Sequence, residues 1–541
     1  MVSNWFRLGW QGLACALIFA FISSAIYGQY INYSPAPFMD YWNGVLRFYL
    51  ESMQDPLAWW VQHNEHRIFL SKLLFWLDMR YFGGRSLLLV PVNTVLLLLT
   101  AGLLVAYARK LIPSEEGGSR LVLAGLMTMF CMAWMQNQNI VWGFQSQFIL
   151  VYLLPLLSFY ALARSRYDIN RSGFWRFLSV FMGVISAYSM ANGLLVLPVL
   201  VVLYWLMGEP VKRIFTVFMM FVVATLVFFI GYQSTAGSSL GPGVLFDRPW
   251  KILEFTLAYL GNPAYWIFGS VSAAIAAGML AVAMALFFFW RRKSLVAEPY
   301  ALALLAFIAY VFGSACVTAL GRAFFDISLA ASSRYTTPSL LMWAALIILL
   351  LSRLQGRVNA IPWVMLVVAL LLIPLQMKAF TIDTSMFTPH QKAVAALSIR
   401  MRVDEEQAKR QLHPFYTPEE ETYLFKARDA KVSIFSVDQE YPVDQLGKPL
   451  AQAGGESCTG AIEKSRPTET PFQATAVYGA LDVSVLSETG YVLFGDADGL
   501  VKGIAIAGRD HPGYGGDVGE RNFDGYLIGD SNFHGMRCVR K

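Results

Sequence analysis

The sequence of 541 residues is poor in charge. Asp, Glu, Lys and Arg make up 14% of it, whereas about a quarter is usual in soluble domains. The shortage is confined to residues 1–377, which consist of one apolar run after another, while residues 378–541 have the composition of a soluble domain. A globular core cannot take up eleven such runs, but a bilayer can. The sequence therefore predicts an integral membrane protein.

The motifs of common soluble enzymes are also missing. The sequence has no Walker loop, no Rossmann glycine fingerprint, no G-x-S-x-G and no Cys/His cluster with zinc spacing. A net charge of +6 comes without the basic patch that binds nucleic acid. We therefore expect no nucleic-acid partner and assign no metal ligand, although a divalent cation as a cofactor stays open. The apolar runs contain almost no ionisable residues, which disfavours a transporter with a charged path.

Eleven membrane spans are predicted, and the first of them is kept as a helix. Residues 8–27 could instead be a cleaved signal peptide, but no good cleavage site follows them. The predicted spans are residues 8–27, 86–108, 121–135, 147–163, 175–190, 193–207, 214–232, 264–290, 299–319, 338–352 and 361–377.

Alternate connections between these spans are basic, and this pattern predicts an orientation. Lys and Arg gather after every second span, whereas "QNQNIVWGFQSQ" and "ANG" on the other side carry neither. Because short cytoplasmic loops are enriched in Lys and Arg, the N-terminus is expected in the cytoplasm and the C-terminus outside. The basic loops contain residues 109–120, 164–176, 212–213, 291–293 and 353–357.

Three further regions complete the predicted fold, an α-helical polytopic bundle over residues 1–377 with an extracytoplasmic tail. The first outer loop, residues 28–85, has apolar residues at helical spacing and predicts surface helices. Residues 378–430 are expected to form a helical connector. Residues 431–541 alternate apolar and polar residues between Gly and Asp-Gly turns, which favours a small antiparallel β-sandwich or barrel.

The tail holds two of the five cysteines, Cys458 and Cys538. In an oxidising exterior, such a pair suggests a disulfide. Two unrelated free thiols are the alternative.

Asp40 is the first candidate for chemistry, because it lies in "PFMDYW" about a dozen residues after the first span. A carboxylate at the membrane surface can act as general base toward an acceptor hydroxyl, and neighbouring aromatics such as Trp42 can stack on a sugar ring. The alternative is a structural one, in which Asp40 caps the helix that follows it.

A second candidate is "HNEHR", residues 63–67, which gathers an acid, two imidazoles and a guanidinium among aromatic residues. Glu65 and His66 are predicted to contact substrate, and Arg67 to bind phosphate. His63 and His66 could share a metal if both are helical. A solvated loop with local ion pairs is the alternative.

The third candidate is "GRAFFDISLAASSRYTTPS", residues 321–339. Arg322 and Arg334, with Tyr335 beside the latter, are predicted to lie in an outer loop. The enrichment of Lys and Arg in cytoplasmic loops does not explain arginines on that side of the membrane. Guanidinium groups bind phosphate oxygens in two-point geometry, so an anionic headgroup or diphosphate is the expected ligand. Snorkelling interfacial arginines are the alternative. Gln145 and Asn192 are weaker candidates that could simply cap helices.

This layout resembles the GT-C class of membrane-integral glycosyltransferases. The shared features are a cytoplasmic N-terminus, a long first outer loop with surface helices and an early acidic residue, many spans and a soluble outer domain at the C-terminus. The segment from Asn64 to Ile68 is also similar to a motif in the first loop of uncharacterised bacterial membrane proteins. By position, Asp40 matches the family's carboxylate base, and Arg322 and Arg334 match its phosphate-binding residues loosely. Many members carry a second acid close to the first, whereas "MDYW" has one.

The resemblance implies a multi-pass protein of the bacterial cytoplasmic membrane. It implies transfer of a sugar, with inversion, from a polyprenyl-phosphate-linked donor to a glycan, lipid or protein acceptor of the envelope. Two other classes stay open: a non-catalytic protein that binds glycan during envelope assembly or export, and a transporter of lipid-linked sugars.

Overall fold

The chain folds mainly into helices, and its residues divide into two compact units. In the computed structural model, 70% of the structure is helical. The first, which we call the membrane unit, comprises Met1–Tyr30, Trp59–Leu73 and Leu89–Thr381. The second unit comprises Ile31–Ala58, Leu74–Leu88 and Ile382–Lys541. The structure describes residues 2–112, 117–233, 247–291, 297–322, 324–354, 360–383, 387–403, 405–413, 418–436, 441–468, 473–482, 489–507 and 522–540.

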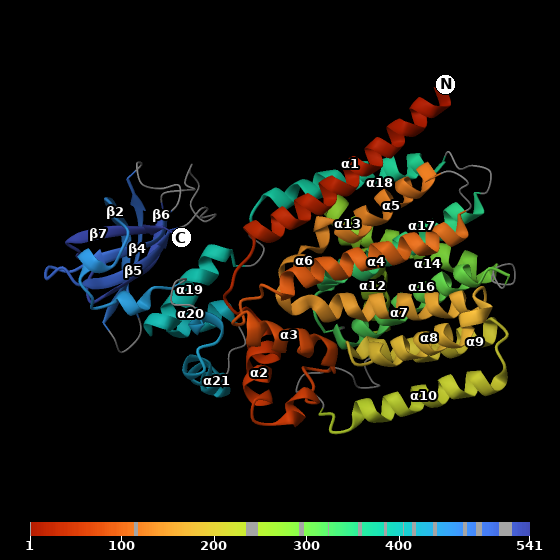
Figure 1. Cartoon of the computed structure of the whole chain (residues 1–541), viewed down its shortest axis with the longest axis horizontal. Helices are drawn as coiled ribbons and strands as arrows, with labels where there is room; N and C mark the ends of the chain where they lie inside the picture. Colours follow the sequence, from red (N-terminus) through yellow and green to blue (C-terminus); the bar gives the residue numbers. More distant parts are fainter. Residues whose placement is uncertain are drawn as a thin grey trace. The chain divides into compact units, whose positions relative to one another are not determined.

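Among the described residues of the membrane unit, eight helices are long and apolar enough to cross a membrane, and they run side by side as a bundle (Figure 1). A helix satisfies its own backbone hydrogen bonds, so apolar runs of this length are stable in hydrocarbon. The chain is therefore a multi-pass membrane protein, as predicted. The eight helices are α1 (Val2–Ile31), α4 (Leu89–Leu111), α7 (Ser146–Ser165), α10 (Val211–Phe229), α14 (Val271–Trp290), α16 (Pro299–Arg322), α17 (Thr336–Arg353) and α18 (Ala360–Gln376).

Three of the eleven predicted spans coincide with shorter helices. These are α5 (Gly117–Met132), α8 (Ser172–Ser186) and α9 (Val196–Leu206), with 16, 15 and 11 residues. At 1.5 Å per residue they are about 16–24 Å long, less than the roughly 30 Å of hydrocarbon in a bilayer. They pack against α4, α7 and α10, respectively. The structure thus supports eight crossings, and the number eleven remains a prediction.

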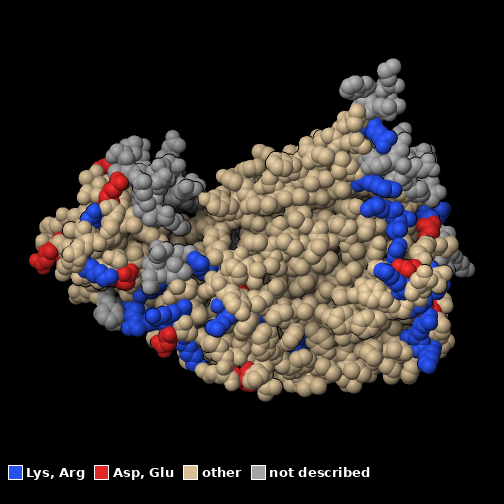
Figure 2. All heavy atoms as spheres, in the orientation of Figure 1, with Lys and Arg blue, Asp and Glu red and all other residues tan. Residues whose placement is uncertain are grey.

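Basic side chains of the membrane unit gather at one end of the bundle (Figure 2). Arg109, Arg164 and Arg353 lie in the last turns of α4, α7 and α17. We call this the basic end. The opposite end, where α7 and α17 begin, we call the amide-rich end, because asparagine and glutamine side chains gather there. Between the two ends, the face visible in Figure 2 carries almost no charge, as expected of a surface that meets lipid tails.

Short helices connect the long ones; several of them lie at the amide-rich end, whereas η5 follows α7 at the basic end. Helix α3 begins in the membrane unit and ends in the second unit. The short elements are η2 (Pro56–Trp59), α3 (Phe69–Tyr81), η3 (Trp134–Gln136), α6 (Asn137–Val141), η4 (Gly143–Gln145), η5 (Ile169–Arg171), η6 (Ala191–Leu195), α12 (Pro249–Leu260), α13 (Asn262–Phe268), η7 (Ile327–Ala331), η8 (Ser333–Tyr335) and η9 (Met377–Phe380).

The second unit joins part of the first loop to the tail. The sequence suggested that residues 28–85 belong with the membrane domain, but residues 31–58 and 74–88 group with the tail. The contacts are specific, since the backbone N–H of Met39 donates to the carbonyl of Leu412 at 2.8 Å. The helices of this unit are η1 (Trp42–Arg47), α2 (Phe48–Ser52), α19 (Pro389–Met401), α20 (Glu405–Leu412), α21 (Pro418–Asp429), η10 (Ser433–Phe435), η11 (Val443–Gln445) and η12 (Leu450–Gln452).

The tail ends in one antiparallel sheet of seven strands with the order β1-β7-β4-β5-β6-β3-β2. Strands β1 and β2 lie at opposite ends of this order, yet only two residues separate them in the chain. The sheet must therefore curl until its edges approach, like a small barrel, and it does not form the two packed sheets of the predicted sandwich. The strands are β1 (Glu456–Ser457), β2 (Gly460–Pro467), β3 (Ala474–Leu481), β4 (Thr489–Gly495), β5 (Val501–Ala507), β6 (Asn522–Ile528) and β7 (Gly535–Arg540).

Two links hold the sheet together and to its helices. Cys458 and Cys538, the pair proposed from the sequence, form a disulfide with their Cα atoms 5.7 Å apart. His390 of α19 lies 2.8 Å from the Asp524 carboxylate of β6. Thr388 and Gln391 form a capping box that fixes the start of α19.

Candidate functional site

The "HNEHR" segment is a tight hairpin and not a helix. The backbones of His63 and His66 exchange two hydrogen bonds of 2.8 and 2.9 Å, and Asn64 takes a positive φ of 48° in the turn. The two imidazoles are therefore not one helical turn apart, which removes the geometry that the metal hypothesis assumed. Glu65 lies in the same turn and is partly exposed.

Arg67 is a structural clamp within the membrane unit. Its Nε donates to the Phe228 carbonyl at 3.0 Å, one terminal nitrogen donates to the Ile230 carbonyl at 2.6 Å, and the other to that of Trp60. The first two carbonyls lie at the end of α10 and lack helical partners of their own. Arg67 is only 3% exposed, so we leave it out of the proposed phosphate site.

Part of the third sequence candidate lines an open pocket at the amide-rich end. Its volume is about 140 Å³. Lys251 and Glu254 enter it from α12 and Arg322 from the end of α16, and none of these three forms a hydrogen bond or ion pair with another described residue. The full lining is Lys251, Glu254, Phe255, Arg322, Phe325, Asp326 and Ile327. We call this the arginine pocket.

The electrostatics of the arginine pocket combine both signs. The pKa of Asp326 is lowered because Ser328 donates hydrogen bonds to its carboxylate, and the positive charge of Lys251 adds to the effect. Cations on one wall can bind phosphate oxygens, carboxylates can accept hydrogen bonds from hydroxyl groups, and the Phe255 and Phe325 rings supply an apolar face. This is a combination of groups that suits a sugar phosphate.

Arg334 lies beside the same aromatic wall. Its side chain forms no hydrogen bond or ion pair with any described residue, and its Nε is buried without a partner. Its guanidinium carbon is 5.4 Å from the centre of the Tyr335 ring, and that ring is 6.4 Å from Phe255 of the arginine pocket. The structure therefore brings Arg322, Arg334 and Tyr335 into one region.

Buried amides fix the backbone that carries Arg334. The Asn139 side chain donates to the Arg334 carbonyl at 2.9 Å, and Ser333 donates to Asn137 at 2.6 Å. Asn262 donates to the carbonyls of Ala330 and Ser332 at 3.0 and 3.1 Å. The uncharged loop "QNQN" thus has a structural role, since it holds the segment with the arginine in place.

Gln145 and Asn192 are both buried in the membrane unit but differ in their surroundings. Asn192 approaches the hydroxyl of Tyr152, which shares a 2.8 Å hydrogen bond with that of Tyr259. Tyr259 packs on Tyr335 at 5.1 Å, so a series of three tyrosines connects Asn192 to the residue that follows Arg334. Gln145 is fully buried and neither polar atom of its amide has a protein partner in the described residues.

In the second unit, Asp40 presents an unpaired carboxylate. Its side chain is partly exposed and forms no hydrogen bond or ion pair with a described residue. It follows Met39, whose φ is 51°, and it precedes the π-helical turn η1, whose N-cap has no side-chain hydrogen bond. Strained backbone and π-helical turns both concentrate at functional sites. The residue at the N-cap of η1 is Tyr41, and the Asp40 side chain bonds no backbone N–H group of the described residues. The capping role that we considered from the sequence is therefore absent.

Trp42, proposed to stack on sugar, is a core residue. It is 3% exposed, and its indole N–H donates to the Pro37 carbonyl at 3.1 Å. On the same turn, Arg47 bonds Glu51 at 2.9 Å, and Tyr423 donates to that carboxylate at 2.7 Å. These contacts position η1, so Trp42 supports Asp40 indirectly.

Lys392 of the second unit packs its ammonium group over the ring of Phe38, 4.1 Å from the ring centre. Loss of contact with water lowers the pKa of Lys392 to about 8, an effect that the charge of Asp383 opposes. The lysine connects α19 to the segment that leads to Asp40, and it makes this connection sensitive to pH.

Stability of the protein should rise with pH between about 8 and 10.5, the folded and ordinary values of the Lys392 pKa. Below pH 8 both states carry the proton, so this group causes no pH dependence; above it, the unfolded chain alone keeps the proton and deprotonation favours the folded state. Thermal unfolding of the full chain in detergent, in pH steps, measures the slope. Lys392→Met should remove this rise, and an unchanged slope would contradict the assignment.

No group of three or more His, Cys, Asp or Glu side chains in the described residues is arranged to hold a metal ion. Whether a divalent cation takes part stays a prediction. No protein-family model, curated protein or solved structure matches the chain. The assignment to the GT-C class therefore also remains a prediction.

The sequence reading missed Lys251 and Glu254. Both lie in "PWKILEF", where two charges three residues apart stand on an otherwise apolar segment. This spacing places them on one side of a helix, a signal that was available. That these two residues lie close to Arg322 could not be predicted, because about 70 residues separate the two segments in the sequence.

Proposed function

We propose that the protein transfers a sugar from a polyprenyl-phosphate-linked donor to an envelope acceptor. The observation that carries the proposal is the pair Arg322 and Arg334 at the amide-rich end: Arg322 lines a pocket with Phe255, and Arg334 lies at Tyr335, whose ring contacts Phe255. Neither arginine forms an ion pair with a described residue. A partly buried guanidinium without a counter-ion is stabilised when an anionic ligand binds.

A lipid-linked phosphate suits the surroundings of the two arginines. Arg322 is the last residue of α16, and Arg334 lies in η8 directly before α17, so a ligand held there can keep its hydrocarbon tail in the bilayer. Lys251, Glu254 and Asp326 supply polar contacts for the sugar, and Gln145 and Asn192 are candidates for further contacts from buried positions. Glu65 and His66 stay candidates for the acceptor side. We place this end of the membrane unit on the outer face of a bacterial cytoplasmic membrane.

In the proposed reaction, Asp40 acts as the general base. Its carboxylate takes the proton of the acceptor hydroxyl, whose oxygen forms the new bond to the anomeric carbon. The bond between that carbon and the phosphate oxygen breaks, and the phosphate leaves with the electron pair. Arg322 and Arg334 stabilise the charge that develops on it. Attack from the side opposite to the leaving group inverts the anomeric centre. A divalent cation could assist at the phosphate.

Arg334→Gln should weaken donor binding about ten-fold or more, because a charge-assisted hydrogen bond contributes roughly 1.5–3 kcal/mol. The apparent KM for a polyprenyl-phosphate sugar, measured with protein in nanodiscs, should rise while kcat changes less. Arg334→Lys should restore part of the affinity. Arg248→Gln is the matched control, since Arg248 lies over Phe324 at 4.7 Å and does not line the arginine pocket. An unchanged donor KM in Arg334→Gln would remove this residue from the site.

A further inference from the structure

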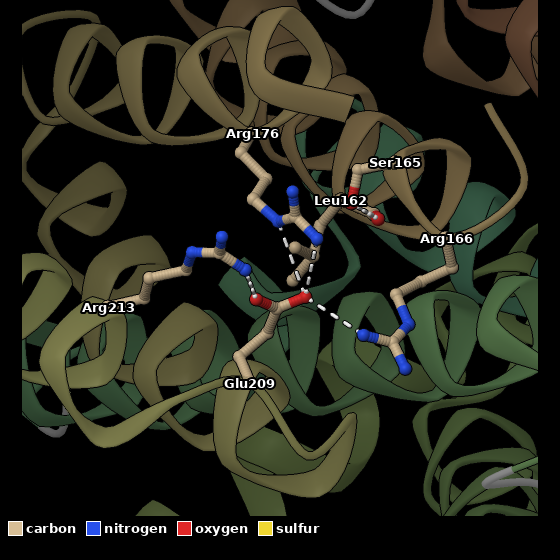
Figure 3. A network of polar contacts seen from close by, with 6 residues as sticks. All are labelled: Leu162, Ser165, Arg166, Arg176, Glu209 and Arg213. Carbon is tan, nitrogen blue, oxygen red and sulfur yellow. Dashed lines mark hydrogen bonds and ion pairs between the residues drawn. The ribbon is translucent and has the colours of Figure 1, made fainter. Parts of the chain in front are cut away.

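Three arginines share one buried carboxylate at the basic end of the membrane unit (Figure 3). Glu209 lies between α9 and α10, and its side chain is fully buried. One of its oxygens accepts from Arg166 and Arg176, each at 3.1 Å, and the other from Arg213 at 2.6 Å. The arginines come from the end of α7, from α8 and from α10, so the cluster joins three helices.

The cluster carries more positive than negative charge. Burial alone would raise the pKa of Glu209, but the bonds from Arg213, Arg176 and Arg166 outweigh it and lower the pKa. The carboxylate is therefore charged, and three guanidinium groups against one carboxylate leave a surplus of two positive charges. Arg166 and Arg213 remain 40% and 48% exposed, so their remaining N–H groups can reach an external ligand.

The helix ends at the cluster already have acids beside them. The turn η5 leads directly into α8, and the Asp168 carboxylate that precedes η5 accepts a hydrogen bond from the Arg171 backbone. Glu209 directly precedes Pro210, the N-cap of α10. Acids at these positions suit the positive end of a helix. The surplus of positive charge therefore comes from the guanidinium groups and not from the helix ends.

The neighbouring surface is apolar and exposed. Phe177 follows Arg176 directly and is 65% exposed, Trp205 stands four residues before Glu209 in the sequence and is 68% exposed, and Phe215 stands two residues after Arg213 and is 59% exposed. Such side chains are expected to meet lipid tails and the interface. An anion that binds here therefore has hydrocarbon beside it.

We propose that the cluster of Arg166, Arg176, Arg213 and Glu209 is a binding site for the headgroup of an anionic phospholipid. The phosphate accepts hydrogen bonds from the exposed guanidinium groups, and the acyl chains lie along the aromatic side chains of α8, α9 and α10. The surplus charge and the exposed guanidinium groups favour the anion, and the apolar surface favours a lipid over a free phosphate. This site is separate from the arginine pocket at the opposite end.

Lipid retention tests the proposal directly. The full chain is reconstituted in mixed phosphatidylglycerol and phosphatidylcholine, extracted mildly, and its bound lipids are identified by native mass spectrometry. In the double variant Arg166→Gln/Arg213→Gln, the enrichment of bound phosphatidylglycerol over phosphatidylcholine should be at least about three-fold lower than in the unaltered protein. The control is Arg353→Gln, which breaks a one-to-one ion pair with Glu298 at the same end and should leave the enrichment unchanged. Equal retention by the double variant would overturn the proposal.

A second variant separates lipid binding from a purely structural role. Glu209→Gln leaves three arginines without their carboxylate, so the melting temperature should fall in phosphatidylcholine nanodiscs. Phosphatidylglycerol should restore most of the loss, because the lipid phosphate takes the place of the carboxylate. Glu298→Gln, the control, should show no such lipid-dependent recovery. The same loss in both lipids would mean that the cluster is structural only. Recovery with inorganic phosphate in phosphatidylcholine, equal to that with phosphatidylglycerol, would overturn the assignment to a lipid.

Discussion

Replacing Asp40 by asparagine is expected to abolish sugar transfer while the protein still folds and inserts. The carboxylate makes no hydrogen bond or ion pair with a described residue, so its removal breaks no packing contact. Asparagine has the same shape but cannot accept a proton, and loss of a general base lowers rates by about 10²–10⁴-fold. Transfer from a polyprenyl-phosphate sugar to membrane acceptors, followed with a radiolabelled sugar, measures the effect.

Asp55→Asn is the matched control for Asp40→Asn. Asp55 lies in the same unit, is exposed, and accepts a hydrogen bond from the Leu57 backbone at 2.8 Å. Its replacement should leave transfer within about two-fold, since surface substitutions rarely have large effects. If Asp40→Asn kept full transfer activity, Asp40 would not be the general base. If neither the unaltered protein nor the variant transferred sugar, the glycan-binding class without catalysis would become the better interpretation of this protein.

Replacing Gly278 by alanine should destabilise the membrane unit strongly. Gly278 of α14 touches the backbone of α12, and a Cβ atom there would overlap the Leu257 carbonyl oxygen. The reciprocal contact is at Gly261, where a Cβ atom would overlap the Ala274 carbonyl oxygen. Small residues permit such close approach of membrane helices. A backbone carbonyl, unlike a side chain, cannot rotate out of the way, so α12 and α14 must move apart. We expect this separation to lower the free energy of unfolding by at least about 1–3 kcal/mol.

The measurement is thermal unfolding of the full chain in detergent, together with the fraction that elutes as one species. Gly102→Ala is the control, because nothing lies within 4 Å of a Cβ atom at that glycine of α4. It should be neutral or slightly stabilising. Since α12 carries Lys251 and Glu254, Gly278→Ala should also weaken donor binding. A variant with unchanged melting temperature would contradict the close packing of α12 on α14.

The candidate site could be predicted in part. The segment from Arg322 to Tyr335 was found because arginines are unexpected on the side opposite to the basic loops, and the structure places both arginines next to one aromatic wall. Arg67 and Trp42 looked equally suitable in the sequence. The structure shows that backbone carbonyls bind the charge of Arg67 and that burial hides the ring of Trp42. Sequence spacing does not show which side chains are already bound.

What the sequence determined by itself is the membrane character, the position of the long helices and the separation of charge between their ends. Each of these depends on many residues of one kind, so single exceptions do not matter. Only the tertiary structure decided which polar side chains are free, that the first loop shares a unit with the tail, and that one carboxylate serves three arginines. These features depend on partners far apart in the chain, and such partners meet only when the helices have packed.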